Sequence, residues 1–343
     1  MSKIEVRDGA LNFMRGGLMP VYMQSVGVDI PERRISNDEL ATIVDTTDEW
    51  IRSHTGIGSR HIAADGSLTS DMSVAAARKA MAKAGIAAED LDLIVVATAT
   101  PDYFGFPSTA CIVQEKLGAK NCAAFDLTAG CSGFVYALNV ASGYLETNRA
   151  RHALVLGAET LSRITNWEDR GTCVLLGDGA GAAVLSRRDE GENAVLANVL
   201  GADGSGAKDL YMIQAERSKT FSPAPPVVPL LYMNGRNVYN FAVKIIPQMV
   251  QRLLENCGRK LDDIAWIVPH QANARIIQAA AKRLGLPEER FYMNIEEYAN
   301  TSSASIPIAL NEMDEKGLLK RGDLIMLLAF GAGLTYGGTI LRW

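Results

Sequence analysis

Residues 90–138 read DLDLIVVATATPDYFGFPSTACIVQEKLGAKNCAAFDLTAGCSGFVYAL, and residues 262–310 read DDIAWIVPHQANARIIQAAAKRLGLPEERFYMNIEEYANTSSASIPIAL. Each segment runs from an apolar strand-like stretch to a helix ending in Leu-Gly, then to a second strand and a segment closing in Ala-Leu. Leu117 and Leu284, which open the two Leu-Gly pairs, are 167 residues apart, and the closing residues Leu138 and Leu310 are 172 apart. This internal repeat predicts two similar α/β halves.

The predicted strands of both halves are continuously apolar. Residues 93–97 read LIVVA and residues 324–330 read LIMLLAF, without polar alternation. Such runs are typical of strands in sheets that are covered on both faces. Because these strands alternate with helices, we expect a layered αβαβα fold of the α/β class, with helices outside, sheets inside and further helices between the sheets.

The chain of 343 residues exceeds the usual size of a single core. We assign residues 19–195 to the N-terminal half, residues 196–343 to the C-terminal half, and residues 1–18 to a loose extension. The opening residues have no continuous apolar region of a secretory signal, and the stretch 325–330 is far shorter than the roughly 20 residues of a membrane helix. The chain is therefore expected to be cytoplasmic. Its formal net charge of −5 gives no sign of nucleic-acid binding.

The cysteines and histidines give no sign of disulfides or of a metal site. The five cysteines are an odd number, in a chain long enough to fold without cross-links. Four of them lie among apolar neighbours and are interpreted as small buried residues. The four histidines show no close spacing with one another or with cysteine pairs. We therefore expect no metal cofactor.

A glycine cluster at residues 177–181, GDGAG, imitates a dinucleotide-binding loop. Such a loop must lead from a strand into a helix, whereas here the strand-like AAVLS follows. We therefore interpret residues 177–182 as a hairpin turn rather than as a nucleotide site.

Cys131 is the cysteine with an unusual position. It follows the small residues Ala129 and Gly130 and precedes an amphipathic helix with Phe134 and Leu138 on its apolar face. At a helix N-terminus the dipole and the backbone N–H groups are expected to lower the pKa of a thiol, and the thiolate is the nucleophile. Position alone leaves two interpretations open, a catalytic nucleophile and a buried cysteine.

His270 and Asn300 are the second and third candidates. His270 follows the strand-like IAWIV, at the carboxyl end of a strand, where α/β sheets place ligands. Asn300 lies in YANTSSAS, just before a helix. Alone, either residue could be an ordinary loop or capping residue. Because the repeat puts Cys131, His270 and Asn300 in equivalent loops at a sheet edge, we expect the three to converge on one pocket.

A series of signatures then follows in order along the chain: TTDEWI (46–51), GIGSRHIA (56–63), FPSTACIVQEKLG (106–118), AGCSGFVYAL (129–138), EDRGT (168–172), GDGAGAAVL (177–185), PHQAN (269–273), NTSSASIP (300–307) and FGAGLTYG (330–337). From about residue 21 to residue 343, the sequence resembles the β-ketoacyl-acyl-carrier-protein synthases III, thiolase-fold enzymes that start bacterial fatty-acid synthesis. Thiolases carry a second cysteine and elongating synthases two histidines, so the Cys-His-Asn set resembles the initiating branch. Chalcone-synthase-like enzymes share this set and stay a weaker alternative, because the chain lacks their overall signature.

The resemblance implies a decarboxylative Claisen condensation that uses a CoA thioester as substrate, without metal or redox cofactor. Cys131 would take the acyl group from acyl-CoA, with an oxyanion hole made by the backbone N–H groups of Cys131 and Ala332. His270, acting as a neutral group, and Asn300 would stabilise the enolate formed when malonyl-acyl-carrier protein loses CO₂. Phe330 would form the apolar wall where the carboxylate is lost.

The resemblance also implies a CoA tunnel. Trp50 and Arg170 match the pair that sandwiches the adenine, and other tunnel positions match Thr46, Gly235, Tyr239, Ala272 and Asn273. The chain departs from the family pattern at His54 and at Asn240, where the best-known members carry an arginine and a lysine. Basic residues for docking an acidic carrier protein remain at Arg275, Lys282 and Arg283, although a merely solvated helix face stays an alternative.

The resemblance further implies a homodimer in which Phe106 closes the far end of the partner's acyl pocket, which would favour short primers. Phe106 could instead be a dimer-core residue away from the pocket, because Tyr103 and Phe104 lie beside it. Two other functions stay open. One is a specialised relative with another acyl donor or acceptor, and the other is a non-catalytic acyl-CoA-binding protein of the thiolase fold.

Overall fold

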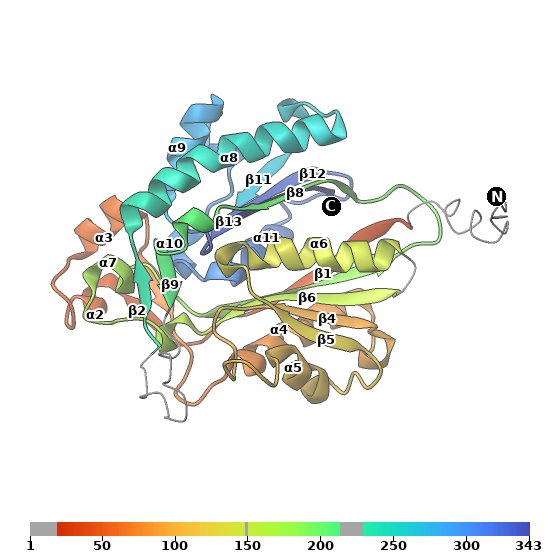
Figure 1. The fold of residues 1–343 in the computed structure, drawn as a ribbon, viewed down its shortest axis with the longest axis horizontal. Coiled ribbons are helices and arrows are strands. Elements are labelled where there is room, and N and C mark those ends of the chain that lie inside the picture. Colours follow the sequence, from red (N-terminus) through yellow and green to blue (C-terminus); the bar gives the residue numbers. More distant parts are fainter. Residues whose placement is uncertain (1–18, 148–149, 213–228) are drawn as a thin grey trace, which may run out of the picture.

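The computed structural model describes residues 19–147, 150–212 and 229–343, and the expected loose extension at 1–18 lies outside them. Two large sheets organise the fold (Figure 1). The first has the order β1-β7-β6-β4-β5, with β1 Val21–Asp29, β4 Leu93–Ala97, β5 Ala123–Leu127, β6 His152–Glu159 and β7 Gly179–Arg187. The second has the order β11-β12-β13-β8, with β8 Val195–Ala202, β11 Trp266–Pro269, β12 Leu324–Gly331 and β13 Thr335–Arg342.

Helices form three further layers around these sheets (Figure 1). The middle layer contains α6 Gly133–Glu146 and α11 Ser305–Glu315, whose apolar residues share one core with both sheets. The outer helices of the first sheet are α4 Thr69–Ala84 and α5 Thr109–Leu117. Those of the second sheet are α8 Gly235–Cys257 and α9 Ala274–Leu284. The expected αβαβα layering is confirmed, whereas the division at residue 195 into two domains stays a prediction.

The smaller elements are the helices α2 Asn37–Leu40, α3 Asp48–Thr55, α7 Arg170–Cys173 and α10 Ile295–Tyr298, and the strands β2 Arg34–Ser36, β3 Ser59–His61, β9 Leu210–Met212 and β10 Leu231–Met233. Of these smaller elements, α3, α7, β9 and β10 contribute residues to the site described below. Short 3₁₀ turns occur at Ala88–Asp90, Gly130–Ser132, Leu161–Arg163, Gly204–Gly206, Leu261–Asp263, Glu288–Arg290 and Ser302–Ala304. No helix within the described ranges is long and apolar enough to cross a membrane.

The repeated Leu-Gly pairs mark the ends of equivalent helices. Gly118 ends α5 with φ 80° and Gly285 ends α9 with φ 67°, both left-handed, and their N–H groups bond back to the last turn of each helix. Glycine adopts this conformation without steric penalty, which explains why it closes both helices.

The glycine cluster at 177–181 is not a hairpin turn, and that interpretation is wrong. Residues 179–187 form strand β7, which pairs with both β1 and β6. A Cβ atom on Gly181 would lie 2.6 Å from the Cβ of Pro307, in helix α11. The glycine therefore allows a helix to pack closely against the strand, which is a contact between distant parts of the sequence.

Candidate active site

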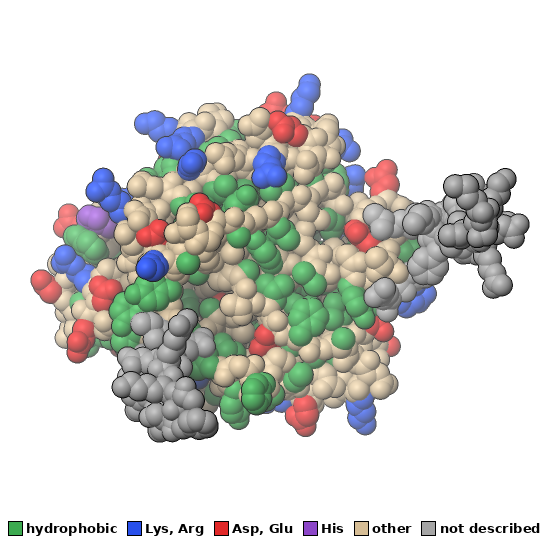
Figure 2. All heavy atoms as spheres, in the orientation of Figure 1, with side chains coloured by type: hydrophobic (Ala, Val, Ile, Leu, Met, Phe, Trp, Pro, Cys, Tyr) green, Lys and Arg blue, Asp and Glu red, His purple; other side chains and the backbone are tan. Residues whose placement is uncertain are grey.

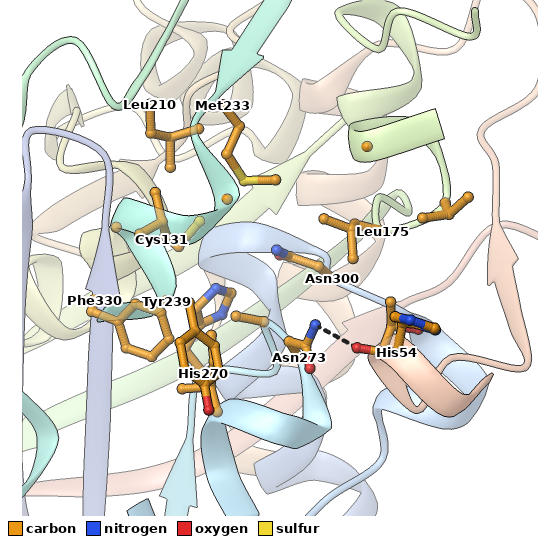
Figure 3. Close-up of a pocket in the computed structure, with 18 of the residues that line it drawn as sticks. His54, Cys131, Leu175, Leu210, Met233, Tyr239, His270, Asn273, Asn300 and Phe330 are labelled. Atoms are coloured by element: carbon orange, nitrogen blue, oxygen red, sulfur yellow. Dashed lines mark hydrogen bonds between the residues drawn. The ribbon is translucent and has the colours of Figure 1, made fainter. Parts of the chain in front are cut away.

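Cys131, His270, Asn300 and Phe330 line one cavity of about 240 Å³. Figure 3 shows their side chains around this space. Cys131 lies in the 3₁₀ turn that precedes α6, and His270 follows directly after β11. Asn300 is held by backbone hydrogen bonds, because its N–H donates to Leu175 O (2.9 Å) and its carbonyl accepts from Gly177 N (3.0 Å). The structure thus brings together the three residues that the sequence singled out.

The loop of Cys131 packs backbone to backbone against the turn that contains Ala332. A Cβ atom on Gly130 would lie 2.7 Å from Ala332 N, and one on Gly331 would lie 2.5 Å from Cys131 N. Only glycine fits at such distances, and Gly130 also has a left-handed φ of 52°. The two glycines therefore keep the N–H groups of Cys131 and Ala332 close together, as an oxyanion hole requires.

The pKa of Cys131 differs from the expectation. The helix α6 begins at Gly133, two residues after the cysteine, and Cys131 itself is half-buried in the wall of the cavity. Burial raises the pKa of the Cys131 thiol to about 12, while the nearby Ser302 hydroxyl acts in the opposite direction. The expected lowering is therefore wrong for the unliganded protein, because loss of hydration outweighs the helix terminus. Without substrate, Cys131 is a thiol.

His270 is buried and neutral. Only 1% of the residue is exposed, and this burial lowers its pKa to about 3. Its Nδ1 lies 2.7 Å from the Ser305 hydroxyl oxygen, which also accepts from Gln271 N at 3.3 Å. A buried hydroxyl needs an acceptor, and Nδ1 is the one recorded for Ser305 within the described chain. We therefore assign the imidazole hydrogen to Nε2, which makes His270 a hydrogen-bond donor toward the cavity.

Asn300 is also oriented as a donor. Its Oδ1 accepts from the backbone N–H of Ser302 at 2.8 Å. Ser302 has a φ of 50°, a left-handed conformation that is costly for a residue with a Cβ atom. This turn directs the Ser302 N–H at Oδ1, which leaves the Nδ2 hydrogens for a ligand. Ser302 and Ser305 were not predicted from the sequence. Their roles depend on turn geometry, although both lie in the NTSSASIP signature.

Most of the predicted CoA positions line the same cavity as Cys131. These are Trp50, Gly235, Tyr239, Ala272 and Asn273, together with the unpredicted apolar residues Val174, Leu175, Leu210, Met233, Val238 and Ile276. Thr46 and Arg170 are not among the lining residues. The Thr46 hydroxyl oxygen is buried and has no hydrogen-bond partner within the described chain.

Trp50 already has two stacking neighbours. The Arg170 guanidinium lies 4.8 Å from the Trp50 ring centroid, and the His54 ring stacks on Trp50 at 4.3 Å with an interplanar angle of 18°. A ring inserted between Arg170 and Trp50 needs about 7 Å, twice an ordinary carbon contact. An adenine sandwich therefore requires Arg170 to move. His54, which occupies the position where the family pattern has an arginine, stacks on the Trp50 ring.

Two further pockets continue from Cys131 on the side of Ala332. The nearer one, of about 80 Å³, is lined mainly by apolar residues and includes Cys131, Asn300, Ser302 and Ala332. The farther one, of about 380 Å³, is more open and shares with it Ala99, Gly130, Ile164, Leu210, Leu231 and Ala332. Phe106 of the same chain lines neither pocket and is 90% exposed.

The predicted docking residues Arg275, Lys282 and Arg283 lie exposed on α9. Arg275 Nε donates to Ser53 O (2.9 Å) and Arg283 donates to Val243 O (3.1 Å), so both are held in place. Figure 2 shows basic side chains over α8 and α9.

Two family descriptions match the sequence: "3-Oxoacyl-[acyl-carrier-protein (ACP)] synthase III" over residues 125–204, and its C-terminal counterpart over residues 254–343. A β-ketoacyl-[acyl-carrier-protein] synthase III of Caldanaerobacter subterraneus subsp. tengcongensis is 49% identical over 319 residues, which cover 92% of this chain and 96% of the relative.

Solved structures of similar proteins agree with these sequence matches. The 3-oxoacyl-[acyl-carrier-protein] synthase III of Aquifex aeolicus VF5 is 42% identical, with a TM-score of 0.87 over 94% of this chain and 100% of the other. The priming β-ketosynthase of the R1128 polyketide biosynthetic pathway is 35% identical, with a TM-score of 0.87 over 95% of this chain and 97% of the other.

Proposed function

The chain belongs to the β-ketoacyl-[acyl-carrier-protein] synthase III family of acyltransferases, which begin fatty-acid synthesis, and we propose that Cys131, His270 and Asn300 carry out its condensation here. The substrates would be an acyl-CoA primer and malonyl-acyl-carrier protein. The observation that supports this proposal is the convergence of the three side chains on one cavity, with His270 and Asn300 both oriented as donors.

In the first step, Cys131 Sγ attacks the thioester carbon of acyl-CoA. The S–C bond to Cys131 forms, the bond to the CoA sulfur breaks, and the thiol proton is transferred, in net terms, to that sulfur. The carbonyl oxygen, negatively charged in the tetrahedral intermediate, accepts from the N–H groups of Cys131 and Ala332. His270 takes no proton, because burial keeps its pKa at about 3.

In the second step, the malonyl group loses CO₂, and the electron pair of the broken C–C bond forms an enolate. His270 Nε2–H and Asn300 Nδ2–H donate to the enolate oxygen. The Phe330 ring, whose centroid is 5.5 Å from that of His270, offers the carboxylate an apolar neighbour, which favours its loss as neutral CO₂. The enolate carbon then attacks the acyl carbonyl, the C–S bond breaks, and the Cys131 thiolate takes up one proton from solvent water.

We propose that acyl-CoA enters past Trp50 and that the carrier protein docks on α8 and α9. Arg236 and Lys244 are exposed on α8, four residues on either side of Asn240. Residues four apart share a helix face, so this face keeps two positive charges although Asn240 has none. Together with Lys282 on α9, they form a basic surface that complements an acidic carrier.

Trp50→Ala is expected to raise the KM for acyl-CoA on the order of tenfold, because base–aromatic stacking contributes about 1–3 kcal/mol, and to leave the KM for malonyl-acyl-carrier protein unchanged. Lys282→Glu, on the docking surface, is the matched variant. It should raise the KM for malonyl-acyl-carrier protein and leave the KM for acyl-CoA unchanged. Steady-state kinetics with each substrate varied separately test both. An unchanged KM for acyl-CoA in Trp50→Ala removes Trp50 from the CoA site.

We propose that two copies pair through β5, with the primer pocket completed by the partner. Strand β5 is an edge strand that exposes Phe125, and such edges pair readily with another chain. Val140 on α6 and Phe106 are also exposed, and Figure 2 shows hydrophobic side chains on the face that carries α6 and β5. The small pocket beside Cys131 continues into one that is open, so a ring from a partner can close it.

Phe106→Thr is therefore expected to shift acylation from acetyl-CoA toward medium-chain primers. Each added methylene that fits gains about 0.8 kcal/mol of burial, whereas one forced against a packed ring costs on the order of 1–3 kcal/mol. Intact-mass measurement of acyl-Cys131 with a panel of acyl-CoAs tests this. The proposed preference is wrong if the native protein accepts dodecanoyl-CoA as readily as acetyl-CoA.

A specialised acceptor remains the second candidate, supported by the missing lysine at Asn240 and by the similarity to the R1128 priming synthase. An experiment that separates the two candidates offers the acylated protein malonyl-acyl-carrier protein, malonyl-CoA and hydroxyl or amine acceptors in turn. The product that forms identifies the acceptor.

We further propose a cytoplasmic location.

A further inference from the structure

Glu159 is a buried carboxyl group that the proposed reaction does not use. It is the last residue of β6, and none of its surface is exposed. Its hydrogen-bond partners come from the end of β4 and from Ser303, in the loop that carries Asn300. Glu159 therefore joins the two halves of the fold close to Cys131.

The Oε2 atom of Glu159 accepts from three donors. The Ala99 N–H lies at 3.0 Å, the Thr100 hydroxyl at 2.7 Å and the Thr98 hydroxyl at 3.3 Å. Both hydroxyl oxygens themselves accept from backbone N–H groups, Thr98 from Thr100 N and Thr100 from Thr160 N. Their hydrogens are thus available for Oε2, which acts purely as an acceptor.

The Oε1 atom has a different environment. It lies 2.9 Å from the Ser303 hydroxyl oxygen, which is also 2.9 Å from the carbonyl oxygen of Ala97. A hydroxyl has one hydrogen, and a carbonyl oxygen can only accept. If Glu159 were ionised, one of these two contacts would bring two oxygens together without a hydrogen. A proton on Oε1 resolves this, because Glu159 then donates to Ser303 and Ser303 donates to Ala97.

The electrostatics agree with a neutral group. Burial raises the pKa of Glu159, and the recorded hydrogen-bond partners are hydroxyls and one backbone amide, with no lysine, arginine or histidine among them in the described chain. The titratable neighbour is Cys131, and the charge of an ionised Glu159 would contribute to raising the pKa of its thiol. A thiolate forms more easily beside an uncharged carboxyl group.

We infer that Glu159 is a neutral carboxylic acid and a positioning residue, whose hydrogen ties the Asn300 loop to the ends of β4 and β6 and whose lack of charge permits the Cys131 thiolate to form. The inference rests on the roles proposed above for Cys131 and Asn300. Glutamine is the isosteric mimic of this state, because its amide donates at one end and accepts at the other.

Glu159→Leu is expected to reduce condensation on the order of 100-fold, as a small misplacement of catalytic groups can, because Ser303 and the three donors lose their partner, and Glu159→Gln should restore it to within about threefold of wild type. A folded Glu159→Gln protein that acylates or condenses more than tenfold slower would overturn the inference, because Glu159 would then act as a base or a charge. If the Glu159→Leu protein does not fold, the activity of the Glu159→Gln protein alone decides whether Glu159 acts as a neutral group.

Two physical readouts do not depend on activity. Infrared spectra at neutral pH should show the carbonyl band of a protonated carboxylic acid that Glu159→Gln lacks. Because the folded state keeps a proton that an unfolded glutamate releases above about pH 4.3, wild-type stability should fall with rising pH relative to Glu159→Gln. Absence of the band, or melting temperatures with no such pH-dependent difference, would refute the neutral state. Failure of wild-type Cys131 to acylate would refute the proposed function but leave both readouts interpretable.

Discussion

Replacing Cys131 with alanine is expected to abolish acyl-enzyme formation and condensation, by at least about 10⁴-fold, while decarboxylation of malonyl-acyl-carrier protein stays measurable. The sulfur is the atom to which the acyl group is transferred, and no other side chain of the cavity can replace it. The donors for the enolate, His270 and Asn300, are untouched by the change. The two half-reactions should therefore separate.

The measurement combines intact-mass detection of the acylated protein with CO₂ release from labelled malonyl-acyl-carrier protein. Cys257→Ala is a matched control, because Cys257 is a free, half-buried cysteine at the end of α8 that does not line the cavity. It should behave as wild type in both assays. Equal loss of acylation and decarboxylation in a folded Cys131→Ala protein would contradict the division of roles.

The layered fold was predictable because its signals are local and occur twice. The strand at 93–97 is β4 as predicted, and the apolar stretch 324–330 lies within β12. The Leu-Gly pairs could be recognised as a repeat because both glycines have the same structural role: each caps the C-terminus of a helix with a positive φ. Local chemistry of this kind is encoded within a few residues.

The glycine cluster at 177–181 was misinterpreted because its cause lies far away in the sequence. Gly181 contacts Pro307, more than a hundred residues later, and no pattern around Gly181 indicates this partner. Glycine without an adjacent helix ordinarily indicates a turn, whereas here Gly181 makes room for α11. The predicted lowering of the Cys131 pKa was wrong for a related reason. The position of the cysteine in the sequence reveals a nearby helix terminus, but it does not reveal the burial that outweighs the effect of this terminus.

The site was predictable in its residues but not in its geometry. Cys131, His270 and Asn300 could be chosen from the repeat and from the family resemblance. The supports of the site could not, because each acts through a contact across the fold: Ser305 on His270, Ser302 on Asn300, and Glu159 on Ser303. Serines within NTSSAS have no individual signal until the left-handed turn at Ser302 is known.

His270→Ala and Asn300→Ala are expected to acylate at Cys131 but to lose condensation, each on the order of 10²–10³-fold, as is typical when one donor to a developing oxyanion is removed. Both side chains are held with an N–H directed at the cavity, and neither is required as a base for the thiol. Single-turnover acylation and steady-state condensation, measured on the same preparations, test this. Cys257→Ala, which does not line the cavity, again provides a folded control.

The pH dependence distinguishes a neutral His270 from a charged one. With a pKa of about 3, His270 is uncharged throughout the neutral range, so wild-type decarboxylation should show no inflection near the usual histidine value of about 6.5. A cationic His270 would instead lose its advantage as the pH rises through that value, and the rate would fall. Such a fall, absent in His270→Ala, would show that the imidazolium stabilises the enolate.

The alanine variants also test the division of roles between the two steps. If the folded His270→Ala or Asn300→Ala protein fails to acylate, the histidine or the asparagine also serves the first step.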